Sequence, residues 1–151
     1  MREDYAHIGL YVDKDSTIYA IPCGWDRITL KGTVIPSGID LLFILEKPYG
    51  DSDMEAFLLN ALENCYIKER EPGPGALEKH FGFKSWTRAV KGLKCISFSW
   101  SKTEGYVFMP TLKAAHKGYE HQPEKQLNLG KNPQKGELAK ALLKAISEST
   151  C

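Results

Sequence analysis

The chain has 151 residues, of which 42% are hydrophobic and 26% are charged, so its composition is that of a globular protein and excludes wholesale disorder. We expect a single domain over residues 1–151, long enough to bury a core without help from a metal or a disulfide. The longest apolar run covers residues 41–45, far short of the ~20 residues that span a membrane, and no secretory signal opens the chain. A cytoplasmic location without a membrane segment is therefore expected.

Charge is distributed unevenly along the chain. Residues 1–75 carry 7 Lys/Arg against 13 Asp/Glu, a net charge of −6, whereas residues 76–151 carry 13 against 6, a net charge of +7. If the two halves cover different sides of the molecule, one face is acidic and the other is basic. The alternative is that the halves interleave in space and their charges largely cancel.

Alternation of apolar and polar residues predicts three strands near the start of the chain, over residues 5–12, 17–21 and 27–35. The first two are separated by a short polar turn, which indicates a hairpin, and the Pro-Cys-Gly sequence at 22–24 is expected to end the second strand. Residues 41–45 have no polar member, so a central strand covered on both faces is predicted there.

A helix is predicted next, because Ser52 and Glu55 fit a capping box and an apolar stripe then recurs at helical spacing. The residues of this stripe are Met54, Phe57, Leu58, Ala61, Leu62 and Cys65. The alternating prolines and glycines at 72–75 continue neither helix nor sheet, so they predict a loop within the domain.

The second half is predicted to hold short helices, a hairpin and a closing amphipathic helix. In chain order we expect helices over 76–81 and 86–90, the latter capped by Ser85, a hairpin of 94–100 with 106–109, an irregular segment over 111–124, an edge strand over 125–129 and a helix over 137–147. Grouped strands with intervening helices predict an α+β fold. Its mostly antiparallel sheet carries one helix after the first four strands and a C-terminal helix packed on it.

The sequence offers little catalytic or metal-binding chemistry. The four cysteines, Cys23, Cys65, Cys95 and Cys151, match no zinc-ligand spacing, and no phosphate-loop, metalloprotease or hydrolase motif occurs. The acidic pairs Asp13/Asp15 and Asp51/Asp53 are better explained by a turn and a helix start than by a cation site. We therefore expect no cofactor, no metal site and no enzyme activity.

A nucleic-acid site is a second interpretation of the basic half, because cations interleaved with aromatic rings bind single strands. The residues concerned are the cations Lys84, Arg88, Lys91 and Lys94 and the aromatics Phe81, Phe83, Trp86 and Trp100. The competing interpretation places these rings in the core, since Phe98 and Trp100 share a phase with Ile96. With a pI of about 7.7 we expect no direct contact with nucleic acid.

Four stretches of the second half carry a family resemblance: GFKSW at 82–86, KGLKCISF at 91–98, FMPT at 108–111 and GELAKALLKAI at 136–146. Over roughly residues 80–148 the chain resembles the CdiI-type immunity proteins of contact-dependent growth inhibition. The resemblance implies a small cytoplasmic protein that binds and neutralises the toxic C-terminal domain of a cognate CdiA effector, commonly a nuclease, without catalysis. Some relatives accept a toxin β-hairpin at a sheet edge.

The acidic half is the predicted partner surface, because a nuclease carries a basic surface with which to meet nucleic acid. The candidate residues are Asp13, Asp15, Asp51, Asp53, Glu55, Glu63, Glu69 and Glu71. The alternative is that these carboxylates only solvate the protein. We expect a monomer or weak dimer. A small enzyme of unknown substrate and a nucleic-acid-binding module are the alternative functions.

Overall fold

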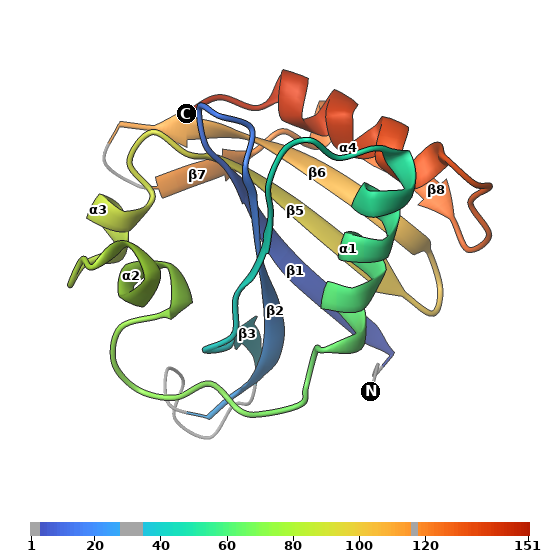
Figure 1. Cartoon of the computed structure of the whole chain (residues 1–151). Coiled ribbons are helices and arrows are strands. Elements are labelled where there is room, and N and C mark those ends of the chain that lie inside the picture. Colours follow the sequence, from blue (N-terminus) through green and yellow to red (C-terminus); the bar gives the residue numbers. More distant parts are fainter. Residues whose placement is uncertain (1–3, 28–34, 116–117) are drawn as a thin grey trace.

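The computed structural model describes residues 4–27, 35–115 and 118–151 (Figure 1). The described strands are β1 (Tyr5–Val12), β2 (Ile18–Asp26), β3 (Ile35–Gly38), β4 (Phe43–Leu45), β5 (Lys94–Ser101), β6 (Gly105–Ala114), β7 (Gly118–His121) and β8 (Leu127–Gly130). The helices are α1 (Asp51–Glu63), α2 (Ala76–Phe81), α3 (Trp86–Ala89) and α4 (Glu137–Glu148), with a 3-10 turn at Pro123–Lys125.

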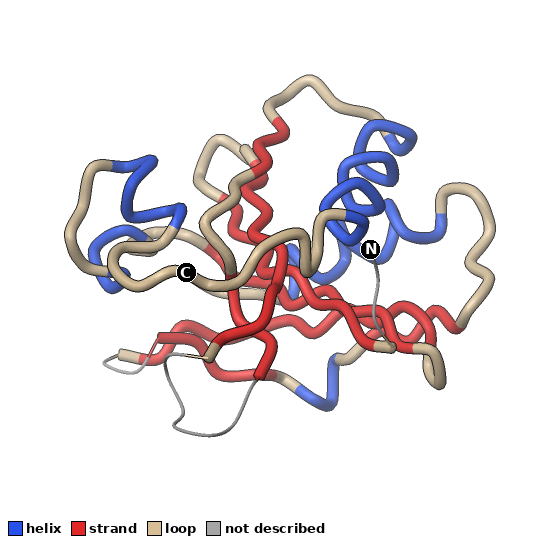
Figure 2. Tube along the Cα trace, turned by 90° about the horizontal axis from the view of Figure 1, so that it is seen from below, coloured by secondary structure: helices blue, strands red, loops and turns tan. Residues whose placement is uncertain are grey.

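These strands form one antiparallel sheet with the order β3-β2-β1-β5-β6-β7, in which β4 also pairs with β2 and β8 pairs with β6. The sheet curls, and Figure 2 shows the strands as a bent layer with helices at its sides. The predicted α+β class is confirmed, as are the helix after the first four strands and the C-terminal helix packed on the sheet.

The main core lies between one face of the sheet and the pair α1 and α4, which pack against each other (Figure 1). Alternation along β1 explains this division, because Ala6, Ile8, Leu10 and Val12 are buried in this core while the residues between them face the other way. The predicted stripe of α1 is confirmed, with Phe57 half-buried and the other members buried. In α4, Leu138, Ala139, Leu142 and Ala145 are buried.

A second, smaller core lies on the opposite sheet face, at the end covered by α2 and α3. Tyr19 of β2 packs there with Leu77 of α2 and Val90 of the turn after α3, and Tyr11 of β1 borders the cluster. Both short helices occur where the sequence predicts them. Ser85 caps α3 by accepting the backbone N–H of Arg88 at 3.3 Å, and Gly82 ends α2 with a φ of 77°.

Two predictions about the early strands are wrong. Strand β2 continues through Pro22 to Asp26, because the proline lies where β2 changes its lateral partner, from β4 at Ile18–Ala20 to β3 at Cys23–Asp26. Strand β4 is short, and among the described strands it pairs only with β2. Ile44 is 40% exposed, so the apolar run at 41–45 is not a central strand. The predicted strand over 27–35 falls largely on residues 28–34, which lie outside the described residues.

The segment predicted to be irregular, 111–124, is also ordered into strands. Strand β6 runs to Ala114, and β7 returns beside it with Thr111 opposite His121. Its polar composition reflects the exposure of this ribbon at the sheet edge, where Leu112 and Glu120 face solvent. The predicted edge strand at 125–129 is present as β8, which begins two residues later and ends one residue later than predicted.

None of the helices in the described residues is long and apolar enough to cross a membrane. Within the same residues, no three His, Cys, Asp or Glu side chains gather in a way that would hold a metal ion. The four cysteines are free thiols, of which Cys23 and Cys65 are buried.

Candidate functional site

A pocket of about 340 Å³ lies on the sheet face that carries α2 and α3. Strand β1 contributes His7, Gly9 and Tyr11, which lie on the face opposite the main core. Gly9 bears no side chain, and the Tyr11 ring packs close to it, since an added Cβ would lie 3.3 Å from Cε2 of Tyr11. The remaining walls come from Ile21, Gly38, Ile39, Arg70, Gly75, Ala76, Glu78 and Trp86. Five separate segments therefore build this pocket.

His7 is a pocket residue whose lowered pKa affects its charge below neutral pH. Its Nε2 lies 2.6 Å from Oγ of Ser97 on the neighbouring strand β5. The pKa of His7 is lowered from 6.5 to about 4, mainly by burial and to a smaller extent by the charge of His121 on β7. The imidazole is therefore neutral at pH 7 and serves as a hydrogen-bonding group of the pocket wall.

The two charged residues of the pocket are held by other parts of the protein. Nε of Arg70 lies 3.5 Å from Oδ2 of the buried Asp26, and its Nη1 donates to Oγ of Ser37 at 3.4 Å. The Glu78 carboxylate accepts the backbone N–H of Gly75 at 2.6 Å, which fixes the start of α2. Both side chains are thus positioned before any partner arrives, which favours a preformed binding surface.

His7 makes stability depend on pH in a predictable direction. Because its pKa is lowered in the folded protein, its contribution is complete above about pH 6.5 and is lost as pH falls towards 4. The free energy of unfolding falls as the pH is lowered from 7.5 to 4.5. In His7→Gln this fall is expected to be smaller than in the parent protein by about 2–3 kcal/mol. Urea denaturation at both pH values measures this difference.

His80 provides the matched control. It is exposed, and its ring centroid lies 5.7 Å from that of Tyr19. His80→Gln is expected to leave the pH dependence as it is in the parent protein. Equal pH dependence in the parent and in His7→Gln would contradict the assignment to His7.

The acidic candidates at the first turn divide into one structural and one exposed residue. The Asp13 carboxylate accepts the backbone N–H of Asp15 at 2.9 Å and of Thr17 at 3.0 Å, and it also accepts the Tyr19 hydroxyl at 3.2 Å. Asp13 therefore organises the β1–β2 turn, as its position predicted. Asp15 is exposed at the tip of that turn.

At the start of α1 the carboxylates have separate roles. Asp53, rather than Glu55, completes the cap, because its Oδ2 accepts the N–H of Gly50 at 2.8 Å. Glu55 instead accepts three backbone N–H groups at the start of α4: those of Gly136 at 3.0 Å, Leu138 at 3.0 Å and Ala139 at 3.2 Å. Asp51 is exposed. The capping box predicted from Ser52 and Glu55 is thus wrong in its residues, although the helix is present.

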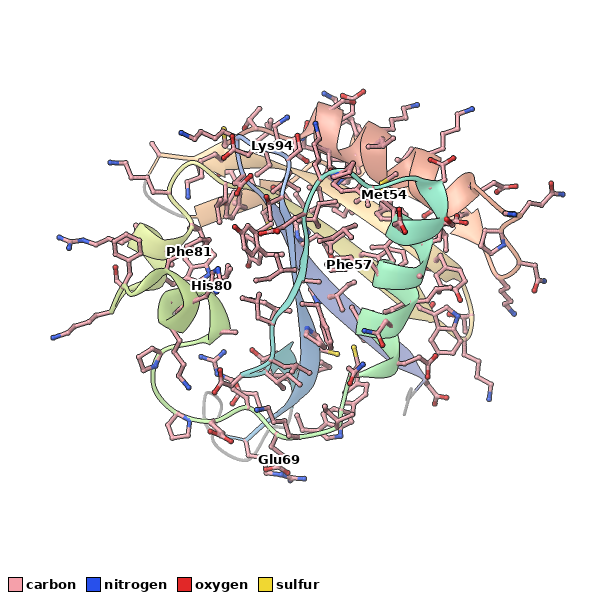
Figure 3. The ribbon with its side chains drawn as sticks, viewed as in Figure 1. Met54, Phe57, Glu69, His80, Phe81 and Lys94 are labelled. Carbon is pink, nitrogen blue, oxygen red and sulfur yellow. The ribbon has the colours of Figure 1, made fainter. Side chains whose placement is uncertain are left out.

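The last three candidates lie towards the far end of α1 and beyond it. Glu63 and Glu71 are exposed, and Glu69 is ion-paired with Arg27 at 2.6 Å. Figure 3 places Glu69 at the bottom of the molecule and Met54, in the first turn of α1, near the top. The eight predicted residues therefore form no single cluster. They extend from the β1–β2 turn along α1 to the loop before α2.

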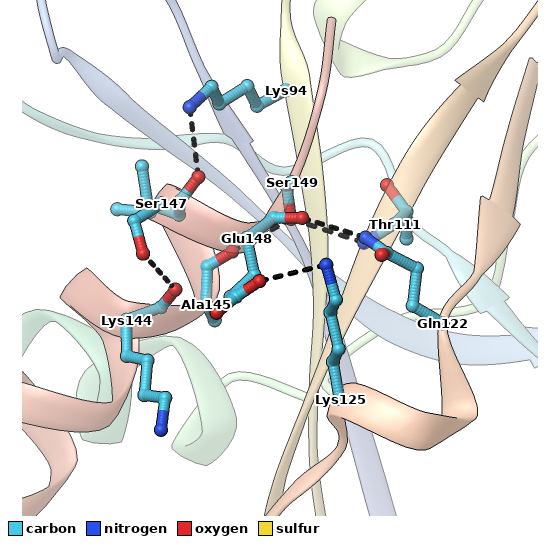
Figure 4. Close-up of polar contacts among 10 residues, drawn as sticks. Lys94, Thr111, Gln122, Lys125, Lys144, Ala145, Ser147, Glu148 and Ser149 are labelled. Carbon is cyan, nitrogen blue, oxygen red and sulfur yellow. Dashed lines mark hydrogen bonds and ion pairs between the residues drawn. The ribbon is translucent and has the colours of Figure 1, made fainter.

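The C-terminal end of α4 is held by contacts that the sequence did not reveal (Figure 4). Nζ of Lys94 donates to the carbonyl of Ile146 at 2.9 Å, and Nε2 of Gln122 donates to that of Glu148 at 2.8 Å. Nζ of Lys125 lies 2.9 Å from the Glu148 carboxylate. Hydrogen-bond donors and cations interact favourably with the negative, C-terminal end of a helix dipole. Because Glu55 accepts N–H groups at the other end, α4 is stabilised at both ends by other segments.

No protein-family model and no curated protein matches the sequence. The structure is similar to a protein of unknown function from Neisseria meningitidis, with a TM-score of 0.68 and 12% identity over 99% of each chain. It is also similar to a chain of a CdiA-CT/CdiI toxin and immunity complex from Yersinia pseudotuberculosis, with a TM-score of 0.67 and 12% identity. That match covers 98% of this chain and 99% of the other. The chain therefore has the CdiI-like fold that the resemblance in its second half predicted.

Proposed function

We propose that this protein binds and neutralises the toxic C-terminal domain of a cognate CdiA effector in the bacterial cytoplasm. The observation that carries the proposal is the likeness to the toxin and immunity complex, which extends over 98% of this chain and includes the sheet and the helices on it. The protein acts by binding alone, as a monomer or weak dimer, and its partner is a nuclease with a basic surface.

The exposed carboxylates of the first half are the proposed partner surface. Asp15, Asp51, Glu63, Glu69 and Glu71 contribute most, because they are exposed. Asp13, Asp53 and Glu55 contribute less, because their carboxylates accept backbone N–H groups. Complementary charge speeds the encounter with a basic partner more than it strengthens the final complex. The pocket over β1 is a second contact region, since its polar groups are already positioned.

Co-expression with the C-terminal domain of a candidate cognate CdiA protein tests the function. Cells that produce this protein together with that domain are expected to survive, while cells that produce the domain with an unrelated immunity protein die. Purified toxin domain and this protein should also elute together in size-exclusion chromatography. If protected and unprotected cells die at the same rate, the proposed function is wrong.

Neutralising the exposed carboxylates is expected to slow association with a basic toxin domain and to weaken its salt dependence. We expect association at low salt to be about two- to tenfold slower for Glu63→Gln/Glu69→Gln/Glu71→Gln and for Asp15→Asn/Asp51→Asn. Stopped-flow association rates at several salt concentrations measure both effects.

The matched control is Glu104→Gln/Glu124→Gln, which removes two exposed carboxylates from the basic half. Its association rate should stay close to that of the parent protein. Identical rates and salt slopes in all variants would contradict this surface and would indicate that the toxin contacts the pocket face or a sheet edge instead.

A further inference from the structure

The region around α2 and α3 has a charge pattern that toxin binding does not explain. Residues 79–103 contain six Lys or Arg and no Asp or Glu. Two of these cations serve the fold, because Lys79 pairs with Asp40 at 2.5 Å and Lys94 bonds to the end of α4. Lys84, Arg88 and Lys91 are exposed instead. Within residues 4–27, 35–115 and 118–151, none of these three forms an ion pair.

Two aromatic rings are exposed beside these cations. Phe83 is 42% exposed and Trp86 is 40% exposed, although large apolar side chains are usually covered. The Trp86 ring is held edge-on by Tyr119, with ring centroids 5.9 Å apart and planes at 82°. The Phe83 backbone is fixed by its N–H, which donates to the carbonyl of Glu78 at 2.9 Å. Both rings are therefore presented from a fixed backbone.

A groove of about 390 Å³ lies at the turn that joins α2 to α3 and is lined by Gly82, Phe83, Lys84, Ser85 and Arg88. The aromatic rings expected in the core divide into two groups. Phe98 is buried and Trp100 is half-buried, whereas Phe83 and Trp86 face solvent. The interpretation that places these rings in the core therefore does not hold for Phe83, and the cations beside it give this surface a positive charge although the pI of the whole chain is about 7.7.

We propose that the α2–α3 groove binds single-stranded nucleic acid, with Lys84 and Arg88 against phosphates and Phe83 against a base. Trp86 lines the pocket over β1 instead and is not part of this site. A single strand offers both anionic groups and open ring faces, which is the chemistry that exposed rings between cations match. A duplex keeps its ring faces stacked, and an acidic peptide offers charge alone. This surface is separate from the acidic residues proposed for the toxin.

Fluorescence anisotropy with a labelled 12-nucleotide oligouridine tests the proposal, with a 12-base-pair DNA duplex as the comparison. The parent protein should bind the single strand more tightly than the duplex at 50 mM salt. Lys84→Gln/Arg88→Gln should weaken binding about tenfold or more and should reduce the slope of log K against log salt by about 1.4, since each phosphate contact contributes about 0.7. Phe83→Ala should weaken binding about tenfold with little change in that slope.

The matched control is Lys140→Gln/Lys144→Gln, which removes two exposed cations from α4 without touching the groove. This variant should bind the oligouridine as the parent protein does, and equal thermal midpoints should show that all variants are folded. Three results would each overturn the proposal: no binding at 50 mM salt, equal loss in the α4 variant, or full displacement by a 12-residue polyglutamate. If Phe83→Ala fails to fold, the two cation variants still decide the outcome.

Discussion

Truncating Leu58 or Leu142 to alanine is expected to lower the free energy of unfolding by about 2–5 kcal/mol, because each change leaves a cavity in the main core. Both side chains are fully buried, Leu58 on α1 and Leu142 on α4. Each contributes to the layer that joins these helices to the sheet. Urea or thermal denaturation monitored by circular dichroism measures the loss.

Leu143 is the control for this prediction, since it follows Leu142 on the same helix but is 47% exposed. Leu143→Ala is expected to change the free energy of unfolding by only about 0.5 kcal/mol. Similar values for Leu142→Ala and Leu143→Ala would show that the apolar face of α4 is not packed as described.

Replacing Glu55 with alanine is expected to lower the free energy of unfolding by about 2–4 kcal/mol. The change removes the acceptor of three backbone N–H groups and takes a negative charge from the positive end of α4. Glu55→Gln keeps the length and one acceptor oxygen but loses the charge, so about half of that loss is expected. Denaturation curves of both variants measure the effect.

An unchanged midpoint for Glu55→Ala would mean that water or a neighbouring group replaces the carboxylate at no cost. The order of the two variants is a second check. A larger loss for Glu55→Gln than for Glu55→Ala would contradict the hydrogen-bonding role, because the amide retains more of the original contact.

The capping pattern of α1 shows how far local sequence rules reach. Ser52 and Glu55 correctly located a helix start, because acidic and small polar residues gather at helix starts for several reasons. The rules could not assign the carboxylates, since the N–H groups that Glu55 accepts belong to residues more than 80 positions later. A local pattern carries no information about such a distant partner.

The strands give a similar result. Residues 5–12 were predicted correctly because one face of β1 is covered by α1 and α4, so period-two alternation is present in the sequence. The exposure of β4 and the ordering of β7 depend on which strands lie beside them, and residues 41–45 and 111–124 do not encode that. The pocket was missed for the same reason, since its walls come from five separate segments.

The two capped ends of α4 bear on how amide hydrogens of this helix exchange with solvent. Its N-cap residue, Gly136, offers no side-chain cap, and a helix of 12 residues is marginal on its own. The amides of Leu138 and Ala139 are protected by a carboxylate of α1. Amides in the first turn of a helix normally exchange freely, but here they exchange only when α1 and α4 separate. The exchange protection of these two amides therefore reports how often α1 and α4 separate.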